Sequence, residues 1–208
     1  KGLICKKMRI VILVENPPGV PGCGYEHGLS FYIETKKHKI LADSGATDIF
    51  LHNAETLGID LTAVDIMFLS HGHYDHGGGI LAFSEVNSDA RIYLKASAGE
   101  DYYHLKKGEE KYIGIDKEIL KLEQCVFVQG DLEIDDELFL YTDVSGARYP
   151  AAGNKKLKKR TAAGFVQDAF DHEQCLVITQ DGKRILLSGC AHNGILNILD
   201  RYKEIFHS

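Results

Sequence analysis

The sequence has few prolines, no long hydrophobic run and no excess of basic residues. Each of these features excludes a class of protein. Its 208 residues contain 4 prolines against 21 glycines, so we expect many turns and no rigid linker. No apolar stretch approaches the roughly 18 residues that a membrane-spanning helix needs, so we expect no membrane association. The net charge of −6 argues against nucleic-acid binding, which normally requires a basic excess. A protein that acts on a small-molecule substrate fits these properties.

The cysteines are too scattered to indicate a disulfide framework. There are five, at positions 5, 23, 125, 175 and 190. An odd and dispersed set is typical of reduced thiols in a reducing compartment. The first seven residues also lack the long apolar core of a signal peptide. We therefore expect a cytoplasmic protein.

Residues 1–208 are expected to form a single α/β domain. Short apolar runs predict strands at 9–15, 29–35, 39–43, 65–70, 91–95, 125–129, 138–142, 175–179 and 184–188. Helical periodicity predicts helices at 47–57, from within 77–83, and at 194–206, the last with Asn193 as its N-cap. We expect the segment 96–160 to be a family-specific, variable region. Its basic run, Lys155–Arg160, is interpreted as a mobile loop that either is simply solvated or attracts an anionic substrate.

Three histidines and one aspartate lie within six residues, directly after the strand expected at 65–70. In a loop at a strand end, His71 and His73 can converge on one cation, while Asp75 and His76 reach a neighbouring position. Imidazole nitrogen and carboxylate oxygen suit Zn²⁺, Fe²⁺ or Mn²⁺. The alternative is a solvated, histidine-rich surface loop, but an apolar strand leading into such a cluster argues against it. The cluster therefore predicts a metal site.

The run His71-Gly72-His73-Tyr74-Asp75-His76 matches the signature of the metallo-β-lactamase superfamily, which this sequence resembles. The strand–turn–strand that leads to Asp43-Ser44-Gly45 is similar to the superfamily's approach to that signature. The resemblance implies an αββα sandwich (α/β, or α+β) with a dinuclear site at the sheet edge. It implies that His71 and His73 bind one metal, and that Asp75 and His76 bind the other. Asp43 would orient ligands from behind, with an ordinary turn aspartate as the alternative.

A second segment, Gly189-Cys190-Ala191-His192, resembles one branch of the superfamily, the dihydropterin ribofuranosylaminobenzene phosphate synthase-like hydrolases. The runs Tyr25–Gly28 and Asp171–Gln174 are also similar to that branch. The resemblance implies that His192 completes the ligand set of the first metal, against the alternative of a histidine at a helix N-terminus.

Four further residues are expected near the site. Cys190 occupies the place of a bridging aspartate and is either a ligand or a small buried residue. His172 lies roughly where other members place a histidine ligand, although the local spacing differs. Glu26 and His27 either face the substrate or a ligand, or have surface or structural roles.

The C-terminus departs from the family pattern. Members usually continue past the last helix with a strand and a helix that supply a further histidine for the second metal. This chain ends at Ser208, and His207 lies in no matching motif. We expect either a truncated chain that lacks this segment or an incomplete second site, and hence one or two zinc ions, with iron or manganese as alternatives.

These observations predict a metal-dependent hydrolase. A metal-activated water or hydroxide would attack a small, phosphorylated or pterin-like substrate, with Asp75 and His192 as the catalytic residues. One alternative is a di-iron redox enzyme, although such members tend to have a carboxylate in the place of His73. The other is a non-catalytic metal-binding or sensing domain of the same fold.

Overall fold

A six-stranded sheet forms the first layer of the structure. The computed structural model describes residues 7–145, 148–149 and 151–207. The strands follow one another across the sheet as β1 (Arg9–Val14), β2 (Ser30–Glu34), β3 (Lys39–Ala42), β4 (Ile66–Phe68), β5 (Arg91–Lys95) and β8 (Cys125–Val128). β1 to β3 are antiparallel, whereas β3, β4, β5 and β8 are parallel. The carboxyl ends of the parallel strands therefore meet at one edge of the sheet, where functional loops of α/β proteins gather.

A second, antiparallel sheet packs face to face on the first. Its strands are, in spatial order, β14 (Lys183–Leu187), β13 (Cys175–Gln180), β10 (Leu138–Tyr141) and β9 (Leu132–Glu133). Ile33, Ile40 and Phe68 of the first sheet share a buried cluster with Leu140 and Ile178 of the second. These side chains come from alternate strand positions, because successive residues of a strand point to opposite faces.

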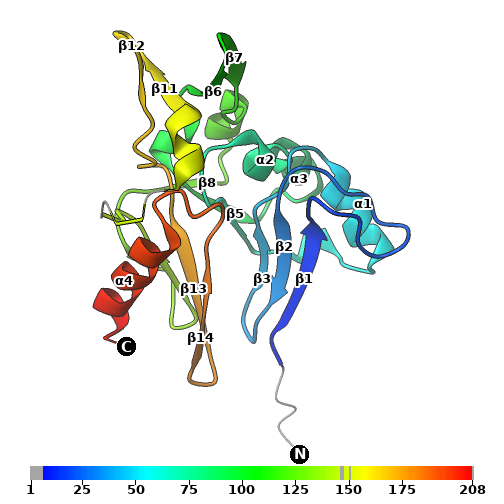
Figure 1. Ribbon diagram of the computed structural model, residues 1–208. Helices are drawn as coiled ribbons and strands as arrows, with labels where there is room; N and C mark the ends of the chain where they lie inside the picture. The colour runs from blue at the N-terminus through cyan, green and yellow to red at the C-terminus, as the bar shows by residue number, and fades with distance from the viewer. Residues whose placement is uncertain (1–6, 146–147, 150, 208) are drawn as a thin grey trace, which may run out of the picture.

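Helices cover the outer face of each sheet. α1 (Ile49–Thr56) and α3 (Ile80–Val86) bury Phe50 and Phe83 in the cluster that contains Leu41 and Met67 of the first sheet. Complete burial of each such phenylalanine contributes about 1.5–3 kcal/mol. α4 (Ile195–Phe206) packs on the second sheet through Ile198 and its neighbours. Figure 1 shows α4 on one side of the molecule and α1 and α3 on the other, with the two sheets between them. This is the expected αββα sandwich.

A third, smaller sheet stands at one end of the sandwich, and we name it the cap sheet. It is antiparallel in the order β12 (Gly164–Gln167), β11 (Leu157–Thr161), β6 (Tyr102–Lys106) and β7 (Glu109–Tyr112). Its two hairpins are far apart in the sequence but project together at the top of Figure 1. Short helices complete the described part of the chain: α2 (Tyr74–Gly77), η1 (Leu61–Ala63), η2 (Ala96–Gly99), η3 (Lys117–Lys121) and η4 (Ala152–Lys156).

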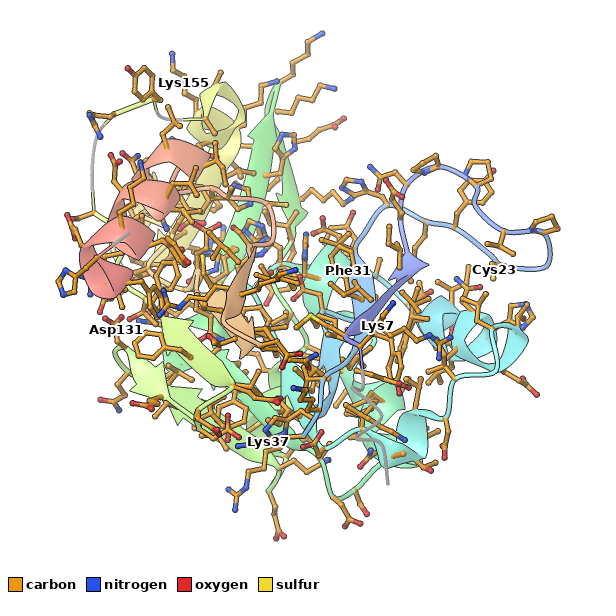
Figure 2. The ribbon with its side chains drawn as sticks, turned by 90° about the horizontal axis from the view of Figure 1, so that it is seen from below. Lys7, Cys23, Phe31, Lys37, Asp131 and Lys155 are labelled. Atoms are coloured by element: carbon orange, nitrogen blue, oxygen red, sulfur yellow. The ribbon has the colours of Figure 1, made fainter. Side chains whose placement is uncertain are left out.

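The interpretation of Lys155–Arg160 as a mobile loop is wrong. Lys155 and Lys156 end η4, and the following residues form β11, a central strand of the cap sheet. β11 pairs with β6 on one side and β12 on the other, so its backbone groups are hydrogen-bonded despite its polar side chains. Figure 2 shows Lys155 beside the cap sheet, far from Lys37 in the β2–β3 turn.

The start of α4 also differs from the prediction. Gly194, at φ +88°, occupies the N-cap position without a side-chain cap. Asn193 instead donates from its amide nitrogen to Phe170 O and to Glu173 Oε2. The side chain that the local sequence predicts as the helix cap therefore makes tertiary hydrogen bonds instead. Ile195, the first residue of α4, is 51% exposed although it is apolar.

The other predicted strands and the first helix lie within one or two residues of the observed elements. The helix expected to begin in 77–83 is α3, and the short α2 precedes it. Within the described ranges, no helix is long and apolar enough to cross a membrane. Cys23, Cys125, Cys175 and Cys190 are free thiols, and Cys5 lies outside the described residues.

Candidate metal centre

The candidate centre lies at the carboxyl end of β4. The chain leaves this buried strand through Leu69 and Ser70 and turns at Gly72 into α2. Gly72 is required here, because a Cβ on it would lie 2.3 Å from the carbonyl oxygen of Ala98. After the turn, Tyr74 N donates to Ile113 O at 2.9 Å. The loop is thus held between the first sheet and the segment that follows β7.

His71, His73 and His192 come together at this position. One nitrogen of each lies within 4.8 Å of the others, and their ring centroids are 4.6–5.0 Å apart. The Nε2 atom of each is buried and has no hydrogen-bond partner among the described residues. An unpartnered buried polar atom is unfavourable. A shared cation would satisfy all three nitrogens, and a set of three imidazoles fits Zn²⁺.

These three imidazoles are held in the neutral form that binds metals. Burial, with the neighbouring His73, lowers the pKa of His192 to about 3. Burial, with His76 and His73, lowers the pKa of His71 well below its usual range. Burial also lowers the pKa of His73, although a contact with Asp168 opposes it. Metal ligation by histidine needs the deprotonated nitrogen, so no proton has to be displaced near neutral pH.

Asp43 and Ser70 orient two of the histidines. Asp43 Oδ1 accepts from Ser70 N, and Asp43 Oδ2 accepts from Ser70 Oγ and from His76 Nδ1, each at 2.7 Å. Because the Ser70 hydroxyl donates to Asp43, its oxygen accepts from His71 Nδ1 at 2.9 Å. Both imidazoles are therefore protonated on Nδ1 and present Nε2 to the centre. Asp43 is buried and its φ is +56°, so it is not an ordinary turn aspartate.

A second group lies beside the first. His76 Nε2 is 3.2 Å from Cys190 Sγ and 3.6 Å from Asp75 Oδ2. His27 Nε2 is 3.4 Å from the same oxygen of Asp75. Burial disfavours the charged form of His76, but Asp43 outweighs it and raises the pKa well above its usual value. Cys190 is exposed, so its interpretation as a small buried residue is wrong, and its thiol faces this group.

His172 supports the loop and has no free nitrogen for a metal. Its Nδ1 accepts from Gly72 N at 2.9 Å, so the ring proton is on Nε2, which lies 3.3 Å from Asp168 Oδ2. His73, Asp168 and His172 do place ligand atoms within 4.8 Å of one another. The protonation pattern nevertheless assigns His172 to positioning. Asp168, which local sequence did not single out, also accepts from Phe170 N at 2.8 Å.

Two glutamates hold the segments around the centre. Glu26 accepts from Ala46 N at 2.8 Å and from Thr47 N at 3.0 Å, so it has a structural role in the loop after Asp43. Glu173 accepts from His192 N at 2.7 Å and from Asn193 N at 2.9 Å. Glu173 thereby fixes the backbone that carries His192. The sequence placed Glu173 in the run Asp171–Gln174 that resembles the branch, but only the structure shows its contacts with His192 and Asn193.

Comparison with known proteins identifies the family of the chain. The sequence model of the metallo-β-lactamase superfamily matches residues 23–208. The chain belongs to the metallo-β-lactamase superfamily. The crystal structure of Tm1679, a metal-dependent hydrolase of the β-lactamase superfamily, shares 32% identity at a TM-score of 0.78, covering 95% of this chain and 72% of the other.

Two sequence relatives of this metallo-β-lactamase domain come from Methanocaldococcus jannaschii. An uncharacterized protein is 30% identical over 199 residues, which cover 86% of this chain and 68% of that protein. The 7,8-dihydropterin-6-methyl-4-(β-D-ribofuranosyl)-aminobenzene-5′-phosphate synthase is 28% identical over 203 residues, covering 86% of this chain and 66% of the synthase. The chain thus spans about two thirds of the length of both relatives.

In this metallo-β-lactamase fold, a cavity of about 320 Å³ opens beside His73 and His192. One wall consists of residues from the centre: His27, His73, Asp75, Cys190 and His192. The opposite wall comes from the cap sheet and the segment after it: His104, Lys111, Ile113 and Leu157. The size suits a small organic molecule, since ligand pockets range from about 300 to 1,000 Å³.

Proposed function

We propose that the chain is a metal-dependent hydrolase whose first metal, zinc, is held by His71, His73 and His192. The convergence of three buried and unpartnered Nε2 atoms is the observation that carries this proposal. Solved relatives of the superfamily include metal-dependent hydrolases. Three neutral imidazoles with one open position are the ligand set of a catalytic rather than a structural zinc site.

A second metal position is proposed at Asp75, His76 and Cys190. Asp75 and Cys190 line the cavity, and His76 Nε2 lies 3.2 Å from Cys190 Sγ and 3.6 Å from Asp75 Oδ2. Carboxylate, imidazole and thiolate are all zinc ligands. Iron or manganese would also accept the carboxylate and the imidazoles.

The protein residues position the reacting groups. A divalent cation, when bound, supplies Lewis acidity that lowers the pKa of water toward neutrality and withdraws charge from the scissile bond. Asp75 Oδ2 faces the cavity between His76 and His27, where it accepts a proton from the attacking water and orients it. His192 forms another part of the cavity wall, and we assign it to the side from which the leaving group would depart. Ile113 and Leu157 contribute apolar side chains to the lining of the same cavity.

The proposed substrate is a small molecule that is phosphorylated or pterin-like. Support comes from the relative whose name includes a dihydropterin and a 5′-phosphate. The size of the cavity fits this class.

The test combines metal analysis with turnover. Purified protein is loaded with zinc, its metal content is measured by mass spectrometry, and hydrolysis of phosphodiesters, carboxylic esters and lactams is followed. His73→Ala is expected to lose most of the bound metal and all turnover. The matched control is His52→Ala, an exposed histidine on α1, which should keep both.

Two outcomes would contradict the proposal. Metal content at the wild-type level in His73→Ala would show that the ligand assignment is wrong. Tight zinc binding by the wild type without turnover on the whole panel would favour a non-catalytic metal-binding domain instead.

A further inference from the structure

The cap sheet presents an ordered row of side chains to the cavity. In the strand register, Leu157 of β11 pairs with His104 of β6, and His104 pairs with Lys111 of β7. Paired residues of neighbouring strands point to the same face. All three side chains accordingly line the cavity over the histidines. The row therefore forms one continuous wall opposite the metal-binding residues.

The opposite face of the cap sheet is filled and cannot serve the same purpose. Tyr103 packs edge-to-face on Tyr112 and Phe165, with ring centroids 5.3 and 5.2 Å apart. Arg160 lies over the rings of Tyr103 and Phe165. Only the face with Lys111 is thus open to a ligand of the centre.

Lys111 is the cation of this wall that has no acidic partner. Its Nζ donates to Tyr74 Oη at 3.3 Å and lies 4.8 Å from the centre of that ring, and no ion pair to it is formed within the described ranges. Its neighbours differ, because Lys159 pairs with Glu100 and Arg160 pairs with Glu110. An ammonium group has three donors, so Lys111 is held in place while retaining donors for a ligand.

We propose that Lys111, with His104 beside it, binds an anionic group of the substrate, a phosphate or a carboxylate. The inference rests on the proposed hydrolase and defines its substrate class more closely. The susceptible bond would lie at the histidine centre, and the anionic group would lie across the cavity against the cap sheet. Such a cation raises affinity through a charge-assisted hydrogen bond and selects against neutral molecules of the same size.

Binding measurements with defined probes test this subsite without knowledge of the substrate. Zinc-loaded protein is titrated by calorimetry with inorganic phosphate and, separately, with acetate. Lys111→Met is expected to bind phosphate about tenfold more weakly, the effect of losing one charge-assisted hydrogen bond, at unchanged zinc content. Lys111→Arg should keep most of the affinity, and His104→Leu should weaken it.

The matched control is Lys158→Met. Lys158 lies next to Leu157 on β11, and its side chain points to the opposite face of the sheet. The Lys158→Met variant loses the same charge from the same sheet, so its affinity for phosphate should stay at the wild-type level. Equal weakening in both methionine variants would show a general charge effect and overturn the subsite. Unchanged affinity in Lys111→Met or in His104→Leu would overturn the role of that residue.

The two anions distinguish the chemistry of the bound group. Phosphate binding that depends on Lys111 indicates a phosphorylated substrate. Acetate binding that depends on Lys111, without such phosphate binding, indicates a carboxylate. Absence of binding of either anion by the wild type would overturn the proposal. Lys111-dependent binding without hydrolysis of any ester would leave the subsite standing while removing the proposed activity. Equal kcat/KM values for matched neutral and anionic esters would remove the subsite alone.

Discussion

Ser70→Ala is the substitution that most directly tests how the first metal site is organised. The hydroxyl of Ser70 donates to Asp43 and accepts from His71 Nδ1, at 2.7 and 2.9 Å. Alanine removes this link and leaves the Nδ1–H of His71 buried without an acceptor. His76 keeps its own contact with Asp43, so the substitution isolates one ligand.

The structure sets the size of the expected effect. An unsatisfied buried donor costs about 1–3 kcal/mol, so the free energy of unfolding of the metal-free protein should fall by that amount. Loss of a group that orients a metal ligand lowers metal affinity by roughly 10–100-fold. At about 1.4 kcal/mol for each factor of ten, this corresponds to about 1.4–2.8 kcal/mol of zinc binding.

Two assays measure these quantities separately. Urea denaturation in the presence of a chelator gives the stability of the metal-free chain, and competition with a fluorescent chelator gives the zinc affinity. Ser84→Ala is the matched control, because the Ser84 hydroxyl donates to Leu81 O within α3, away from the centre. Zinc affinity of Ser70→Ala within about twofold of the control would refute the orienting role assigned to this hydroxyl.

Three further predictions concern other contacts. Gly72→Ala places a Cβ 2.3 Å from Ala98 O and should cost at least about 1–3 kcal/mol of stability, measured by urea denaturation; Gly130→Ala, with nothing within 4 Å of its Cβ, is the control, and equal effects would contradict the steric reason. His172→Asn should keep the wild-type zinc stoichiometry, because neither ring nitrogen of His172 is free; loss of one zinc equivalent by mass spectrometry would make His172 a ligand. Burial opposes the charged form of His38, but hydrogen bonds to Asp135 and Asp65 outweigh it and raise the pKa. The resulting stabilisation is complete below the unfolded pKa of about 6.5 and is lost as pH rises through the folded pKa. His38→Gln should therefore destabilise more at pH 6 than at pH 9, and the reverse order in urea titrations would disprove this sign.

The αββα architecture was predictable because its strands are apolar and its motif is contiguous. Continuous hydrophobic runs mark the strands of the two main sheets, which are buried between layers. The cap sheet was not predictable in this way. β11 consists largely of lysine and arginine side chains on exposed or half-buried positions, and its partner β6 lies more than forty residues earlier. No local pattern of hydrophobicity encodes such a pairing.

The candidate site shows the same limit at the level of single residues. The histidines of the motif stand within six positions and were found from their spacing. Ser70 and Asp168 are ordinary polar residues in the sequence, and their roles arise from partners brought close only by the fold. For His172, the residue was correctly placed near the site, but its function depends on which ring nitrogen meets Gly72, which spacing does not determine.

The segment that follows β7 connects the cap sheet to the metal loop through the backbone itself. Ile113 O accepts from Tyr74 N, and Gly114 pairs with His73, one residue from the start of α2. A ligand that shifts β7 therefore also shifts the backbone of His73, which gives the cap and the centre a mechanical connection. Thermodynamic reciprocity then applies: whatever factor a bound anion contributes to metal affinity, the metal contributes to the affinity for that anion. For the proposed metal and anion sites, anion recognition and metal retention would accordingly share one coupling free energy.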